Sequence, residues 1–191
     1  MRQFSVIVFL AFFLLQGAAF AIERDISQFD EKLIWLQVNT KKQYLDVKFR
    51  DVTLVRFENI AIGRNGAGFK KKRGDDITPL GTYKISWTNR KSRYKIFYGF
   101  NYPSGENAFQ AMHKNLINGK TYKKIMLAHK NNQVPPQNTP LGGMLGIHGL
   151  GVADRKIHES MNWTHGCIAL TNEQIVKLDK WVKKGMKVVV K

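Results

Sequence analysis

Cysteine is almost absent from this chain of 191 residues, which contains only Cys167. A single cysteine cannot form a disulfide within the chain, and none lies near the amino terminus to carry a lipid anchor. A lone thiol in a chain that we expect to be exported therefore needs another explanation. Nucleophilic catalysis is the leading one, and a buried cysteine that acts as a small apolar side chain is the structural alternative.

Long apolar stretches are also missing. The run at residues 6–15 is about half the ~20 apolar residues that a membrane-spanning helix needs, so we expect no stable membrane anchor. Arg2 precedes the run and Ala19-Phe20-Ala21 follows it, which is typical of a secretory signal. We expect residues 1–21 to be removed and residues 22–191 to form a single catalytic domain that is exported to the periplasm or cell wall.

Acidic residues are few: 14 Asp and Glu stand against 31 Lys and Arg, which gives a formal net charge of +17. Such a charge favours a polyanionic partner. Nucleic acid is an unexpected partner for an exported protein, so an anionic cell envelope fits better. The alternative is that the lysines only keep the protein soluble.

The hydrophobic pattern predicts a mostly β fold with a few helices. Alternating apolar and polar residues predict strands, and a strand is also expected to follow the turn at 78–81. The expected strands are 34–38, 44–47, 52–57 and 186–190, and the expected helices are 106–116, 121–131 and one that starts after Thr171. Thr171 and Gln174 make a capping box, and Gly185 suits a left-handed stop.

The residues around the cysteine suggest a thiol nucleophile with a histidine base. They read Thr164-His165-Gly166-Cys167, and a second pair, His148-Gly149, lies upstream. A thiol needs a neighbouring base to become nucleophilic at neutral pH. His165 would share a face with Cys167 if the segment is extended, whereas His148 suits a neighbouring strand joined by a polar loop at 151–162. Spacing leaves both histidines open, and the Gly166 and Cys167 amides are the expected oxyanion donors.

A metal centre is the weaker interpretation of these residues. His148, His158, His165 and Cys167 lack the short ligand spacings of zinc sites. We expect neither a metal nor a cofactor.

The combined motifs resemble the L,D-transpeptidase catalytic domain, also called YkuD-like. The resemblance lies in His148-Gly149, in Trp163-Thr164-His165-Gly166-Cys167 with Asn172 soon after, and in the segment 74–83 that ends at Tyr83. It extends from about Leu33 to Val190 and implies a β-sandwich-like catalytic domain.

The resemblance also implies a reaction. Cys167 would attack a peptidoglycan tetrapeptide stem between its third residue, a diamino acid, and the terminal D-alanine, with His148 as the base, oriented by a carbonyl near Gly149. The thioester would pass to an amine of a second stem or of a wall-attached protein, or to water. A carbapenem would acylate the same thiol. The remaining residues implied in substrate or oxyanion contacts are His165, Gly166, Gly149, Thr164, Tyr83 and Asn172.

One position departs from the commonest form of the motif, which has an arginine two residues after the cysteine where this chain has Ala169. Loss of a forked cation removes a bidentate partner for a substrate carboxylate or for a structural anion. Arg155 and Lys156, in the intervening loop, are candidates to replace it. Three functions stay open: a transpeptidase, a carboxypeptidase or other hydrolase on the same scaffold, and a wall-binding protein without activity.

Overall fold

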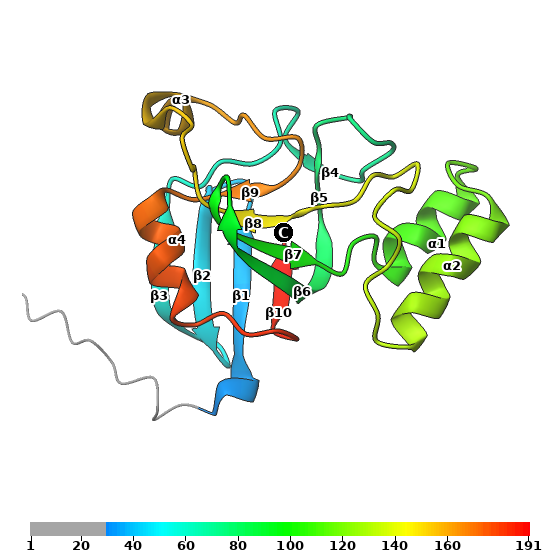
Figure 1. Ribbon diagram of the computed structural model, residues 1–191, viewed down its shortest axis with the longest axis horizontal. Coiled ribbons are helices and arrows are strands. Elements are labelled where there is room, and N and C mark those ends of the chain that lie inside the picture. The colour runs from blue at the N-terminus through cyan, green and yellow to red at the C-terminus, as the bar shows by residue number, and fades with distance from the viewer. Residues whose placement is uncertain (1–29) are drawn as a thin grey trace, which may run out of the picture.

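The computed structural model describes residues 30–191, and the expected signal segment lies outside them. Its fold is mostly β, as predicted, with eight strands in the order β3-β2-β1-β10-β6-β7-β8-β9 and a separate pair, β4-β5 (Figure 1). The strands are β1 (Ile34–Asn39), β2 (Tyr44–Phe49), β3 (Val52–Glu58), β4 (Ala67–Gly68), β5 (Thr78–Pro79), β6 (Gly81–Ser92), β7 (Lys95–Phe100), β8 (Gly146–His148), β9 (Ile168–Ala169) and β10 (Lys187–Val190).

The first three strands form the predicted antiparallel meander. Leu36 of β1 pairs with Val47 of β2, and both side chains are fully buried. The carboxy-terminal strand β10 then pairs in parallel with β1, through Leu36 and Val188. Because β10 also pairs with β6, the last residues of the chain join the meander to the second half of the sheet.

The long strand β6 belongs to both halves. Its beginning, residues 81–84, pairs with β10, and its remainder pairs with β7. The two halves cross each other in Figure 1, with β7 and β8 lying in front of β1 and β10. This arrangement provides the two layers that a sandwich-like domain needs for its core.

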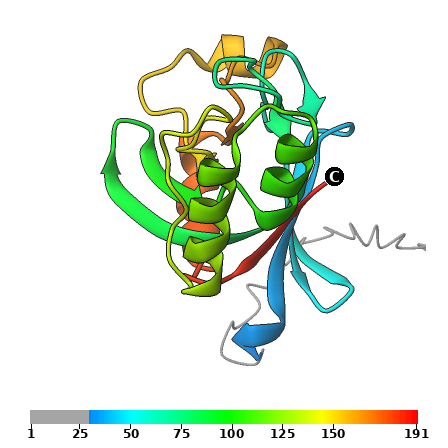
Figure 2. The same ribbon diagram turned by 90° about the vertical axis from the view of Figure 1, so that its right-hand side faces the viewer.

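Within residues 30–191, four α-helices and a short 3-10 helix (Glu31–Leu33) accompany the sheet. They are α1 (Gly105–His113), α2 (Gly119–Lys130), α3 (Arg155–Ser160) and α4 (Asn172–Asp179). Helices α1 and α2 match the two predicted helices and lie side by side at one end of the molecule (Figure 2). Within residues 30–191, no helix is long and apolar enough to cross a membrane.

Helix α4 begins at the predicted capping box. The Thr171 hydroxyl accepts a hydrogen bond from the Gln174 amide at 3.2 Å, and the Gln174 side chain accepts one from the Thr171 amide at 2.9 Å. Ile175 and Leu178 are fully buried on the inner face. Gly185 has the expected left-handed conformation, with a φ of 90°.

The prediction of a loop throughout 151–162 is wrong, because α3 occupies its second half. Asp154 starts this helix by accepting a hydrogen bond from the Lys156 amide at 2.7 Å. Only His158 of the six residues is buried. A helix this short and exposed leaves no apolar periodicity in the sequence.

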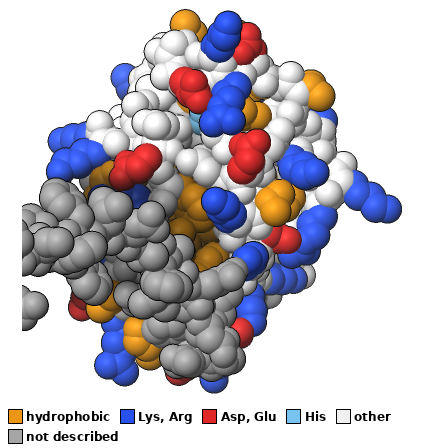
Figure 3. All heavy atoms as spheres, turned by 90° about the vertical axis from the view of Figure 1, so that its left-hand side faces the viewer, with side chains coloured by type: hydrophobic (Ala, Val, Ile, Leu, Met, Phe, Trp, Pro, Cys, Tyr) orange, Lys and Arg blue, Asp and Glu red, His pale blue; other side chains and the backbone are white. Residues whose placement is uncertain are grey.

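Basic side chains do not form one patch on the face drawn in Figure 3. Where this face is not covered by grey atoms, Lys and Arg side chains lie at separate places, with Asp and Glu between some of them. A dispersed positive field of this kind attracts an extended anionic surface more readily than one compact anion.

The cap of α4 provides a test of this part of the fold. Thr171→Ala should lower the free energy of unfolding by about 1 kcal/mol, because the Gln174 amide loses its acceptor. Thr171→Ser keeps the hydroxyl and should retain most of that stability. Urea denaturation measures both, and equal stability of the alanine variant and the wild type would contradict the assignment.

Candidate active site

Two short parallel strands position the candidate nucleophile and base. Ile147 of β8 pairs with Ile168 of β9, and His148 pairs with Ala169. Cys167 directly precedes β9, two residues before Ala169. Because alternate residues of a strand share a face, Cys167 and His148 lie on the same face of the sheet. Both line one open cleft of about 780 Å³.

His148 is held in one orientation. Its Nδ1 donates a hydrogen bond to the Gly149 carbonyl at 2.7 Å, the contact that the family resemblance implies. A carbonyl oxygen only accepts, so Nδ1 carries the hydrogen and Nε2 keeps its lone pair. The neutral imidazole is therefore in the tautomer that can accept a proton from a thiol.

Aromatic rings surround this imidazole. Its centroid lies 4.3 Å from the ring of Tyr94 and 6.2 Å from that of Phe97, and Trp163 meets it edge-on at 5.8 Å. His148 is only 3% exposed, and this burial lowers its pKa to about 4. The imidazole is consequently neutral at physiological pH and available as a base.

The Cys167 thiol lies at the edge of the core, with Sγ 3.6 Å from the Met144 carbonyl oxygen. Burial raises its pKa to about 11, although the Gly146 backbone amide and the Lys70 charge act in the opposite direction. The resting pair is therefore a neutral thiol beside a neutral imidazole. A nucleophilic role for Cys167 would therefore require proton transfer to His148 during the attack of sulfur.

The turn before Cys167 needs a glycine. Gly166 has a φ of 122°, and a Cβ at this position would lie 2.7 Å from the Ile77 carbonyl oxygen. The Gly166 amide donates to the Thr164 hydroxyl at 3.1 Å, and that hydroxyl donates to the Cys167 carbonyl at 2.7 Å. This corrects the expectation that the Gly166 amide is an oxyanion donor, because the turn already uses it. The role of the Cys167 amide stays a prediction.

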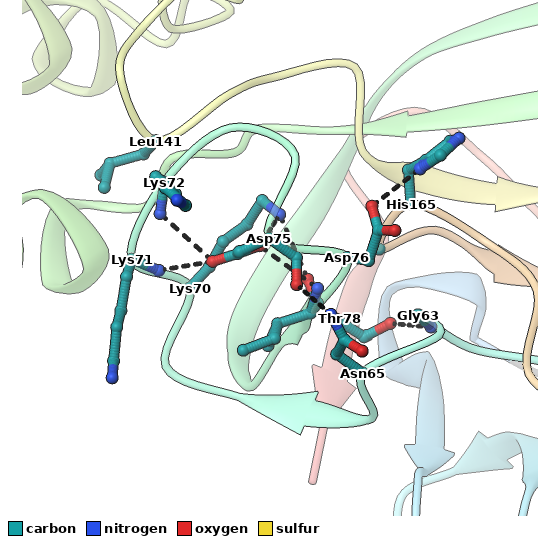
Figure 4. Close-up of polar contacts among 12 residues, drawn as sticks. Gly63, Asn65, Lys70, Lys71, Lys72, Asp75, Asp76, Thr78, Leu141 and His165 are labelled. Carbon is teal, nitrogen blue, oxygen red and sulfur yellow. Dashed lines mark hydrogen bonds and ion pairs between the residues drawn. The ribbon is translucent and has the colours of Figure 1, made fainter.

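His165 lies on the rim of the same cleft, and 73% of its side chain is exposed. Its Nδ1 donates to the Asp76 carboxylate at 2.7 Å (Figure 4). Arg64 lies 3.7 Å from the other oxygen of Asp76. Sequence reasoning missed Asp76. Asp76 lies in segment 74–83, which is part of the family resemblance, and this was the feature of the sequence that could have identified it.

The neighbouring Asp75 fixes the loop that carries Asp76. Its carboxylate accepts hydrogen bonds from the backbone amides of Lys71, Lys72 and Ile77 and pairs with the buried Lys70 ammonium (Figure 4). These contacts lower the pKa of Asp75 against the opposing effect of its burial. These contacts hold together the loop that carries Asp76.

Two predicted contact residues lie elsewhere. Tyr83 is 1% exposed and stacks on Phe100 with the ring centroids 5.3 Å apart, and its hydroxyl lies 3.0 Å from the Leu80 carbonyl oxygen. Asn172 bonds the Gly151 amide at 2.9 Å and the Gly151 carbonyl at 2.8 Å. Both expectations are corrected: Tyr83 is a core residue, and Asn172 anchors the chain that follows Gly149.

The family comparison agrees with this geometry. Residues 34–190 match the model of the L,D-transpeptidase catalytic domain, YkuD. The chain belongs to this family. No curated protein sequence matches it.

Solved structures of low sequence identity share the fold. Pgp2 from Campylobacter jejuni, described as a helical cell shape determining protein, is 22% identical with a TM-score of 0.57, over 85% of this chain and 49% of that one. Bd1075 from Bdellovibrio bacteriovorus is 16% identical with a TM-score of 0.50, over 87% of this chain and 50% of that one. The chain therefore spans about half the length of these structures.

The motif position that this L,D-transpeptidase domain fills with Ala169 lies in the core. Ala169 is fully buried, and its backbone amide and carbonyl both bond to Ala61, at 2.8 and 3.0 Å. Arg155 and Lys156, the expected substitutes, are on the exposed helix α3 and do not line the cleft. Arg155 pairs instead with Glu159 of α3 and Glu173 of α4. The cations that line the cleft are Arg64, Lys70, Arg73, Lys91 and Arg93.

The described residues offer no obvious metal site. Among residues 30–191, no group of three or more His, Cys, Asp or Glu side chains is placed to hold a metal ion. His148 and Cys167 are engaged by backbone groups instead.

The neutral thiol–imidazole pair predicts how Cys167 reacts with a simple alkylating agent. The rate of alkylation by iodoacetamide should rise continuously between pH 6 and pH 10, because the thiolate population grows toward the raised pKa of about 11. Intact-mass kinetics measure this, with the urea-unfolded chain as the control for an ordinary thiol of pKa about 8.5. A plateau near neutral pH would instead reveal a preformed thiolate–imidazolium pair.

Proposed function

We propose that the chain is a peptidoglycan L,D-transpeptidase that forms a thioester between Cys167 and a tetrapeptide stem and transfers the acyl group to an amine. The observation that supports this most is the placement of Cys167 and His148 on one face of two paired strands, in one open cleft. The hydrogen bond from His148 to the Gly149 carbonyl also supports it, because this bond selects the tautomer whose Nε2 can accept the thiol proton.

In the acylation step, Sγ of Cys167 attacks the carbonyl carbon of the third stem residue. The thiol proton passes to Nε2 of His148 as the S–C bond forms. The imidazolium then gives this proton to the nitrogen of the terminal D-alanine, and the C–N bond breaks. Free D-alanine leaves, and a neutral imidazole and a thioester remain.

In the transfer step, the nitrogen of an acceptor amine attacks the thioester carbonyl. His148 takes one proton from this nitrogen and returns it to the sulfur as the C–S bond breaks. The products are a new amide and the free thiol. Water in place of the amine gives a tripeptide acid, so the same two residues support a carboxypeptidase as the alternative.

The place of action that we propose is the periplasm or cell wall. The net charge of +17 and the separate basic side chains on the face drawn in Figure 3 suit an anionic envelope. Pgp2 of Campylobacter jejuni is described as determining helical cell shape, and we propose a role in cell-wall organisation and shape for this chain as well. A wall-attached protein is a further possible acceptor in this proposal.

Product analysis tests the reaction. Incubation of tetrapeptide-rich muropeptides with the purified protein should give crosslinked dimers and free D-alanine, detected by mass spectrometry. Cys167→Ala and His148→Ala should each abolish both products. A tripeptide without dimers would identify a carboxypeptidase, and full activity of the folded Cys167→Ala variant would overturn the mechanism.

A covalent probe separates an enzyme from a wall-binding protein. A carbapenem should add one acyl group to the protein, because sulfur attack opens the β-lactam ring without loss of atoms. Intact-mass spectrometry should show this adduct in the wild type, less of it in His148→Ala and none in Cys167→Ala. Retention on purified sacculi with no adduct in the wild type would support a protein that only binds the wall.

A further inference from the structure

The proposed reaction puts a carboxylate close to His148. The leaving nitrogen, which His148 protonates, is bonded to the carbon that carries the D-alanine carboxylate. A group that recognises this carboxylate must therefore lie near His148 and carry a positive charge. Ala169, which pairs with His148 across the strands, has no side chain that can do so.

Three of the five cations that line the cleft already have partners, and a fourth, Lys91, has an ammonium group rather than the planar fork that matches a carboxylate. Lys70 is buried and pairs with Asp75, and Arg64 pairs with Asp76 at 3.7 Å. Arg73 donates to the Thr139 carbonyl at 3.4 Å. Lys70, Arg64 and Arg73 are therefore already used in contacts within the loops around the cleft.

Arg93 differs from these cations. It lies in the turn between β6 and β7, and its guanidinium packs over the Tyr94 ring, with Cζ 4.7 Å from the centroid. Its Nη2 donates to the Tyr94 hydroxyl at 2.7 Å. No ion pair of Arg93 occurs among residues 30–191. Several guanidinium N–H groups therefore remain for a ligand.

Tyr94 connects this cation to the base. The same ring contacts the His148 imidazole, with the centroids 4.3 Å apart. Arg93 is thus one aromatic ring away from the group that protonates the leaving nitrogen, and both residues line the cleft.

The backbone around Arg93 is also fixed relative to His148. The Gly149 amide donates to the Ile96 carbonyl at 3.2 Å, and a Cβ at Gly151 would lie 1.9 Å from the Arg93 carbonyl oxygen. The chain that follows His148 therefore lies directly on the turn. Burial is the main cause of the lowered pKa of His148, and the charges of His158 and Arg93 lower it further.

We infer that Arg93 binds the carboxylate of the residue that leaves the donor stem, in place of the motif arginine that this chain lacks. A forked guanidinium suits a planar carboxylate. Arg93 would then select stems that end one residue beyond the scissile bond, because a longer or amidated stem has an amide at that place. This inference rests on the proposed function.

The test compares two synthetic donors, a tetrapeptide stem with a free terminal carboxylate and the same stem with a terminal carboxamide. The wild type should prefer the carboxylate, and Arg93→Gln should lower kcat/KM for it by roughly 10- to 100-fold, mainly through KM. The same variant should lower kcat/KM for the carboxamide much less, because no carboxylate is lost from its partner. Arg93→Lys should recover part of the preference, and Arg155→Gln, outside the cleft, should match the wild type.

A binding measurement keeps this inference separate from the proposed reaction. Calorimetric titration of both stems into Cys167→Ala, with and without Arg93→Gln, needs no turnover. A preference for the carboxylate that disappears with Arg93→Gln supports the inference even if the wild type cleaves no stem, an outcome that would refute only the proposed function. An unchanged preference, or an equal loss for both stems, would overturn the role of Arg93.

Discussion

The candidate site depends on the parallel pairing of two very short strands, β8 and β9. This pairing joins residues that are about twenty positions apart in sequence and puts His148 and Cys167 on one face of the sheet. It is supported from both sides: β7 pairs with β8, and Ala61 bonds both backbone groups of Ala169. The Leu170 amide also donates to the His148 carbonyl at 2.8 Å, directly before the cap of α4. The register of two strands this short is fixed by these hydrogen bonds to neighbouring segments rather than by the length of the strands themselves.

Burial then determines the chemistry of the two residues. Enclosure by Tyr94, Phe97 and Trp163 disfavours the charged imidazole, and burial likewise disfavours the thiolate. The folded protein thus avoids the free energy cost of separating charge in a poorly solvated site. In the proposed reaction, charge develops only when a substrate carbonyl receives the sulfur electrons, so thiol activation would be linked to substrate binding.

Local signals made much of the fold predictable. The alternation in 34–57 specified the meander, and the Thr171–Gln174 box specified the start of α4, because both depend on neighbours in sequence. The proximity of His148 and Cys167 also followed from their spacing and motif. Spacing alone did not identify the base, whereas the structure distinguishes a buried, oriented His148 from an exposed His165.

Features that depend on distant segments were not predictable. The pairing of His165 with Asp76 joins residues far apart in the chain, and Arg93 reaches the site only because the β6–β7 turn packs on the segment after His148. Tyr83 lies within a family motif, yet it packs against Phe100 in the core. A family motif includes both residues that contact the substrate and residues that support the fold, and the sequence alone does not distinguish the two kinds.

The most direct measurement of the central claim is an NMR titration of the His148 imidazole in the intact protein. The account predicts that His148 stays neutral from pH 8 down to about pH 5, with the hydrogen on Nδ1 and a pKa of about 4. Signals of an Nε2–H tautomer, or protonation with a midpoint near 6.5, would contradict it. Either result would mean that His148 is not a buried base poised to take the Cys167 proton.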